Sequence, residues 1–215
     1  MRSFLLLLAL TILGVAAHAQ RIVYTKVFPA SIPAYVKITA TQTGAVTYQE
    51  AVDEEPEKFQ LDPASTTAIF DLAAKLDHFK RKLESGLKVA RTGDKTYRWE
   101  ESPNSFEVTF NYSQDEDARA LQTWFERITE TERMMADLRR TTKYDRLGVN
   151  DVLVRIDTSW QQKRLVAPAQ FVSALDRVAK NDSFLHMAQE RAALLSEAFK
   201  TAGDAPKTTE KASPK

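Results

Sequence analysis

The stretch Ser113–Lys143, SQDEDARALQTWFERITETERMMADLRRTTK, decides the fold. Its apolar residues recur three, four and seven positions apart, which is the spacing of one helix face. They are Leu121, Trp124, Phe125, Ile128, Met135 and Leu138. A capping box at Ser113–Glu116 predicts where the helix begins, and the basic residues near its end suit the negative end of the helix dipole. We predict a single helix over 113–143, about 40 Å long, which is too long for a small sheet to cover alone.

The residues before this helix predict strands. Residues 35–41 alternate polar and apolar side chains, which is the period of a half-buried strand. Thr43-Gly44 then predicts a hairpin turn into a second strand over 45–51. Four further strands are predicted over 24–28, 59–61, 96–100 and 106–110, and a fifth over 87–90, joined to 96–100 by a hairpin loop at 91–94.

A shorter helix is predicted among these strands. Asp62-Pro63 places a carboxylate cap before a proline at the first helical position. The apolar face that follows extends to Leu83, and the cations of Lys80–Lys82 lie near the predicted C-terminal end, where they favour the helix dipole.

After Asp145 the pattern is helical throughout, and strands followed by helices are typical of an α+β fold. We predict an antiparallel β-rich N-terminal part with a packed helix, a long linking helix and a C-terminal helical part. The predicted divisions are a signal peptide at 1–19, the α+β part at 20–112, the linking helix at 113–143, the helical part at 144–203 and a disordered tail at 204–215.

Residues 1–19, MRSFLLLLALTILGVAAHA, have the features of a secretory signal peptide. Arg2 precedes an apolar run, and Ala17-His18-Ala19 forms an A-x-A site with cleavage expected after Ala19. The alternative is a retained anchor, but the run falls short of the roughly 20 residues that a membrane span needs. We therefore expect a periplasmic or secreted protein with no membrane span in the mature chain.

Composition excludes several classes of function. The chain has no cysteine, which rules out a disulfide scaffold, a cysteine-ligated metal, a cysteine nucleophile and a lipoprotein anchor. Thirty Lys and Arg against 29 Asp and Glu give a net charge of +1, so nothing favours nucleic acid as a partner. No G-x-S-x-G, P-loop or dinucleotide fingerprint occurs. We predict no cofactor, no metal and no catalytic residue, and a non-enzyme is favoured over an enzyme.

One set of residues has the spacing of a metal site. Asp182, His186 and Glu190 are four residues apart and project from one helical face. The alternative is a helix-capping carboxylate followed by two surface side chains. The acidic loop at 53–57 similarly has the charge to attract calcium, but it lacks the ligand pattern of an EF-hand and is better interpreted as a solvated connector.

The long helix also carries a candidate interface. Aromatic residues and methionine are enriched in the centres of protein interfaces, and here they are Trp124, Phe125, Met134 and Met135. The alternative is that this stripe belongs to the protein's own core. If both methionines are buried, the helix needs cover on two sides, from the C-terminal helices or from a second copy of the chain.

Two segments, Tyr144–Asn150 (YDRLGVN) and Leu175–Met187 (LDRVAKNDSFLHM), resemble an uncharacterised family of exported bacterial proteins. The resemblance implies a bacterial, exported protein and transfers no catalytic residue. We therefore expect a soluble, non-enzymatic binding or interaction module of the bacterial cell envelope, whose partner is an envelope protein or a second copy of the chain. The alternative is a carboxylate-dependent hydrolase with a pocket between the β-rich and helical parts.

Overall fold

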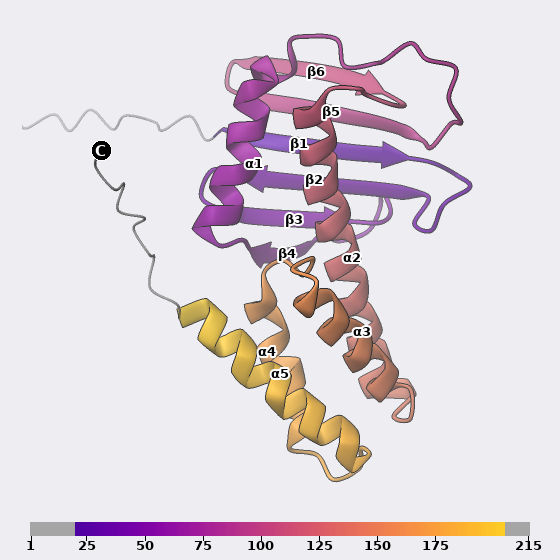
Figure 1. Ribbon diagram of the computed structural model, residues 1–215, viewed down its shortest axis with the longest axis vertical. Helices are drawn as coiled ribbons and strands as arrows, with labels where there is room; N and C mark the ends of the chain where they lie inside the picture. The colour runs from indigo at the N-terminus through magenta and orange to yellow at the C-terminus, as the bar shows by residue number, and fades with distance from the viewer. Residues whose placement is uncertain (1–19, 205–215) are drawn as a thin grey trace, which may run out of the picture.

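The computed structural model describes residues 20–204. The predicted signal peptide at 1–19 and its cleavage after Ala19 lie outside the described residues, and so does the predicted tail beyond Asp204. The fold is α+β, as predicted, with an antiparallel sheet formed by the N-terminal half and helices that mostly follow it (Figure 1).

The sheet has six strands in the order β4-β3-β2-β1-β5-β6, and every neighbouring pair is antiparallel. The strands are β1 (Arg21–Val27), β2 (Tyr35–Thr41), β3 (Ala45–Gln49), β4 (Glu57–Gln60), β5 (Asp94–Glu101) and β6 (Asn104–Phe110). Successive side chains of a strand point to opposite faces. Buried Tyr24, Ile38 and Tyr97 therefore lie on the face covered by helices, while the other face carries polar cross-strand pairs such as Arg98–Glu107.

Five helices and two short helical turns complete the described chain. They are α1 (Pro63–Lys75), η1 (Asp77–Phe79), α2 (Glu116–Tyr144), α3 (Val149–Gln161), η2 (Pro168–Phe171), α4 (Val172–Ala179) and α5 (His186–Asp204). Helices α1 and α2 lie across one face of the sheet, and α2 continues past the β4 edge to pack with α3 and α4 (Figure 1). Between residues 20 and 204, none of the helices has the length and apolar character that crossing a bilayer requires.

Helix α2 takes part in two hydrophobic cores. The first lies between the sheet and the helices, where α2 contributes Phe125 and Ile128. The second lies among α2 to α5 and contains Met135 and Leu138. The loop after α3 returns to the first core with Val166, whose N–H donates to Thr131 Oγ1 at 3.2 Å. The two cores are thus joined both by α2 and by this loop.

The predicted capping box of α2 is wrong in position by two residues. Asp115 is the N-cap, and its carboxylate accepts a hydrogen bond from Ala118 N at 3.0 Å. Ser113 is buried and accepts from Asp115 N instead. A carboxylate satisfies a free N–H at a helix start as well as a hydroxyl does, so the choice between these caps depends on where the chain leaves β6.

The predicted extension of α1 to Leu83 is also wrong, because α1 ends at Lys75. Asp77, His78 and Phe79 follow with positive φ angles of 51°, 51° and 65°, a left-handed turn that places Phe79 in the core 5.2 Å from the ring of Tyr97. One of the predicted cations does reach the end of α1, because Arg81 Nη2 donates to the carbonyl of Lys75 at 3.4 Å. The same guanidinium forms an ion pair with Asp115 at 2.7 Å.

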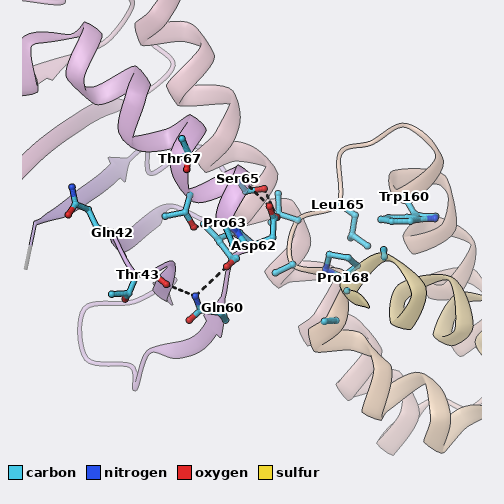
Figure 2. Close-up of a pocket in the computed structure, with 17 residues that line it drawn as sticks. Gln42, Thr43, Gln60, Asp62, Pro63, Ser65, Thr67, Trp160, Leu165 and Pro168 are labelled. Carbon is cyan, nitrogen blue, oxygen red and sulfur yellow. Dashed lines mark hydrogen bonds between the residues drawn. The ribbon is translucent and has the colours of Figure 1, made fainter. Parts of the chain in front are cut away.

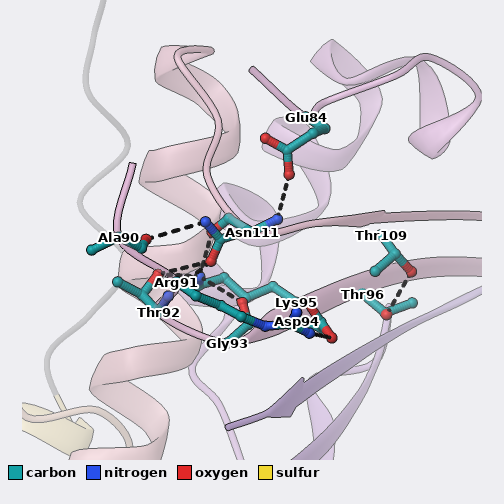
Figure 3. Close-up of polar contacts among 10 residues, drawn as sticks. All are labelled: Glu84, Ala90, Arg91, Thr92, Gly93, Asp94, Lys95, Thr96, Thr109 and Asn111. Atoms are coloured by element: carbon teal, nitrogen blue, oxygen red, sulfur yellow. Dashed lines mark hydrogen bonds and ion pairs between the residues drawn. The ribbon is translucent and has the colours of Figure 1, made fainter. Parts of the chain in front are cut away.

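The predicted hairpin between 87–90 and 96–100 is also wrong. Strand β5 pairs with β6 through the two-residue connection Ser102-Pro103, and residues 87–90 form no strand. Side chains hold this segment instead: Asn111 Nδ2 donates to Ala90 O, and Thr92 N donates to Asn111 Oδ1 (Figure 3). The Lys95 ammonium closes the network by donating to Asn111 O at 2.7 Å.

Candidate functional site

A large cavity lies where the sheet meets the helical part. It has a volume of about 810 Å³, within the roughly 300–1,000 Å³ of small-molecule sites, and we call it the junction cavity. Figure 2 shows its two walls facing each other. Residues 42–43, 60–63 and 65–67 form the sheet-side wall, and residues 160, 165–169 and 202–203 form the helical wall.

The sheet-side wall is fixed by the start of α1. Asp62 is the N-cap, with Ser65 N donating to Oδ1 at 2.9 Å and Ser65 Oγ donating to Oδ2 at 2.6 Å. Gln60 Nε2 donates to Thr43 O at 2.6 Å and so ties the end of β4 to the β2–β3 turn. These hydrogen bonds lie within the wall itself, so the wall is formed before any ligand arrives.

Gly44 brings this turn close to the wall. Its φ is +83°, and a Cβ atom there would come within 2.5 Å of Gln60 Nε2 and 2.9 Å of Leu61 O. A side chain would therefore require the backbone of the wall to move, and only glycine accepts this φ without strain. The Thr43-Gly44 turn signal in the sequence thus also shapes the cavity.

The lining of the junction cavity is almost entirely uncharged. Asp62 is its single charged lining residue, and both carboxylate oxygens already accept hydrogen bonds. The remaining lining is amide, hydroxyl and apolar, with the partly exposed ring of Trp160 in the helical wall. The junction cavity has one carboxylate in its lining, whereas the hydrolase alternative calls for two. A second cavity between the two parts is lined by the carboxylates of Glu126, Glu130 and Asp137.

The structure does not bring the three candidate metal ligands together. His186 Nε2 lies 3.0 Å from Glu190 Oε1, with 83% and 63% of the two side chains exposed, and Asp182 is exposed in the turn before α5. Within residues 20–204, no group of three or more His, Cys, Asp or Glu is placed to hold a metal ion. Asp182, His186 and Glu190 do not share a helical face, because α5 begins only at His186.

The candidate interface residues are mostly core residues. Phe125, Met134 and Met135 are buried, and Phe125 stacks on Tyr24 with ring centroids 4.5 Å apart. Trp124 is partly exposed under the guanidinium of Arg127, 4.3 Å from the ring centroid. The sheet and the C-terminal helices of the same chain cover α2 on two sides, so these three buried side chains present no docking surface.

One buried acid, Glu132, is not among the candidate residues that the sequence predicts. It lies at the wall of a cavity of about 130 Å³ between α2 and the β3–β4 region and accepts a hydrogen bond from Gln170 Nε2 at 2.9 Å. Burial raises its pKa from 4.5 to about 7. The acidic loop also reaches this cavity, where Glu57 pairs with Arg139 at 2.7 Å.

What the junction cavity accepts has to be inferred from its own lining residues. A comparison of the chain with models of protein families, with characterised proteins and with solved structures finds no match.

Proposed function

We propose that this protein is exported and acts in the bacterial cell envelope as a non-enzymatic binding module, with the junction cavity as its ligand site. The observation that carries the proposal is the cavity's lining: uncharged amide and hydroxyl groups beside Trp160 and two prolines, with the one acid used as a helix cap. Such a lining suits an uncharged ligand rich in hydroxyl and amide groups, such as an envelope glycan.

Three features of the sequence support the export half of the proposal. They are the leader-like residues 1–19, the absence of cysteine and the resemblance of 144–150 and 175–187 to exported bacterial proteins. The intact mass of natively produced protein tests it, since cleavage after Ala19 predicts a mature chain that begins at Gln20. A mass that retains the first nineteen residues would contradict the proposed cleavage.

Calorimetric titration with a trimer of N-acetylglucosamine tests the binding half. We expect saturable binding to the wild-type protein. Ala169→Phe fills the cavity from an exposed position of the helical wall and should weaken binding by at least about tenfold, the equivalent of 1.4 kcal/mol. Ala120→Phe, on an exposed position of α2 outside the cavity, is the matched control and should bind as the wild type does.

Absence of binding to the wild-type protein, or equal weakening by both substitutions, would count against the glycan site. Measured thermal unfolding of both variants separates loss of binding from loss of folding, because only a folded variant gives an interpretable titration.

A further inference from the structure

A second cavity, of about 560 Å³, lies between the β1–β2 connection, α2 and α3, and shares no lining residue with the junction cavity. We call it the α2–α3 cavity. Its apolar wall includes Val36, Met134 and Val154, and its rim carries four cationic against three anionic side chains. Its size is within the range of small-molecule sites, and its formal charge is one positive.

Two buried hydroxyl groups of this wall have no hydrogen-bond partner. Tyr24 and Ser159 are 1% and 4% exposed, and neither Tyr24 Oη nor Ser159 Oγ makes a hydrogen bond. Stacking on Phe125 fixes the Tyr24 ring. Since nearly all buried polar groups in folded proteins are paired, two orphaned hydroxyls in one cavity wall point to an occupant that accepts hydrogen bonds. Each oxygen has less than 1 Å² of accessible surface, so side chains of the wall must shift slightly for an occupant to reach it.

Most of the rim charges are already paired. Arg164 lies 2.7 Å from Glu130, and Arg155 lies 2.9 Å from Asp137. The guanidinium of Arg133 lies 3.7 Å from Glu50 and donates to Ile32 O at 3.0 Å. Paired charges offer little to a ligand, so the charge that selects an occupant comes from the two remaining side chains.

Those two are Lys26 and Glu126. Within residues 20–204, the side-chain ammonium of Lys26 makes no hydrogen bond or ion pair, and it adds to the positive potential felt by Lys95. Glu126 accepts a hydrogen bond from Gln122 Nε2 at 2.7 Å. Burial, reinforced by Glu126, raises the pKa of Tyr24, so the tyrosine hydroxyl stays protonated and is available as a donor.

We propose that the α2–α3 cavity binds a single-chain amphiphile with a carboxylate head, the head accepting hydrogen bonds from Lys26 and Tyr24 and the chain lying on the apolar wall. The free ammonium supplies the charge and the orphaned hydroxyls supply unused donors. The apolar side chains account for the chain. This site is independent of the junction cavity, so either one can fail without the other.

The test is calorimetric titration of the full chain with decanoate, decanol and decyltrimethylammonium, three ligands with the same chain and different heads. Decanoate is expected to bind at one site, and decanol at least about tenfold more weakly. The cation is expected not to bind. No binding of decanoate, equal affinity for all three ligands, or preference for the cation overturns the proposal.

Four variants locate the head group. Lys26→Met should weaken decanoate binding by at least about tenfold, while Lys37→Met, a β2 lysine outside the cavity, should leave it unchanged. Glu126→Gln should tighten binding because it removes a repelling carboxylate. Tyr24→Phe should weaken binding while the thermal midpoint of the free protein stays equal or rises, since it deletes an orphaned hydroxyl.

Decanoate affinity and the thermal midpoint together distinguish a ligand-binding role of these residues from a purely structural one. If the Tyr24 hydroxyl has only a structural role, Tyr24→Phe lowers the thermal midpoint and leaves the affinity for decanoate unchanged. That result overturns the assignment of Tyr24 as a ligand-binding residue. Unchanged affinity in Lys26→Met overturns the assignment of the head group.

Discussion

Glu132 is an ionisable group whose environment favours its neutral form. Gln170 supplies a hydrogen bond, and Arg139 lowers the carboxyl pKa slightly, but burial outweighs both and Glu57 adds to it. The group is therefore half-protonated near neutral pH in the folded protein, whereas in an unfolded chain it is ionised.

This difference predicts a pH-dependent stability. Because the folded state holds the proton more tightly, the contribution of Glu132 is fully present below about pH 4.5 and is lost as the pH rises to about 7. Glu132→Gln should raise the free energy of unfolding at pH 8 by roughly 2–3 kcal/mol and leave it nearly unchanged at pH 4. Urea unfolding at both pH values measures this, and an equal effect at both would contradict it.

Lys163 is a residue with a backbone conformation that its side chain disfavours. It follows the C-cap of α3 with a φ of 57°, and its N–H donates to Trp160 O at 2.9 Å. A helix end of this kind usually has glycine.

Lys163→Gly should therefore stabilise the protein by about 1 kcal/mol, measured as a shift of the urea midpoint. Lys163→Ala is the matched control, because it removes the charge and keeps the Cβ atom, and it should give no comparable gain. The contacts of Arg127 with the Lys163 carbonyl involve backbone only and persist in both variants. A gain of equal size in the two variants would show that charge, not φ, is responsible.

Among the elements, the segment between η1 and β5 depends on side-chain hydrogen bonds. Lys95 is buried and donates to Thr92 Oγ1, Gly93 O and Asn111 O, and Asn111 N donates to Glu84 Oε2 at 2.6 Å (Figure 3). The Asn111 N–H holds the pKa of Glu84 below its usual range, so the carboxylate stays ionised as the acceptor.

Lys95→Met should release this segment. The substitution keeps most of the side-chain volume but leaves buried carbonyl groups unpaired, which costs about 1–3 kcal/mol. We expect faster hydrogen exchange of the amides over 87–93 with β1 and β2 unaffected. Exchange rates measured by mass spectrometry decide this, and uniform acceleration across the sheet would indicate global destabilisation instead.

The elements that sequence could predict are those with a clear period. The alternation of 35–41 and the three-and-four spacing of α2 identify their buried faces, because burial itself imposes those periods. The path of residues 76–93 could not be predicted, because it depends on Phe79 entering the core and on side-chain contacts with Asn111, neither of which leaves a periodic signal.

The candidate sites also divide into features that the sequence could predict and features that it could not. A cavity between the two parts could be anticipated from their separate apolar faces, but its lining comes from turns whose positions only the folded chain defines. Glu132 did leave a signal: it is four residues after Ile128 and three before Met135, on the apolar stripe. The unpaired state of Tyr24 and Ser159 left none, since nothing in a sequence shows which hydroxyls lack a partner.

At the scale of the whole molecule, the two cores are held together by more than a shared helix. Arg127 donates to the carbonyls of Lys163 and Arg164, and Thr131 accepts from the buried N–H of Val166. The loop after α3 is therefore attached to α2 at the boundary between the cores, and unfolding of one core removes contacts from the other.

We predict that both cores unfold in one transition. Trp99 lies in the first core and Trp160 packs against the second, so two variants that each retain one of these tryptophans report the cores separately. Their urea midpoints should coincide, as two-state behaviour requires. Thr131→Val leaves the Val166 N–H unpaired and should lower both midpoints together, whereas separated midpoints in the parent variants would contradict the coupling.

The continuity of α2 also fixes the angle between the two halves of the molecule. One residue inserted at 129–133 would rotate everything after it by about 100° and advance it by about 1.5 Å. Seven inserted residues would nearly restore the rotational phase of the helix, but they would displace the helical half by about 10 Å. That displacement would remove Val166 from the first core. Insertions and deletions in this segment should therefore be far less tolerated than substitutions. The length of α2 sets both the distance and the angle between the two halves.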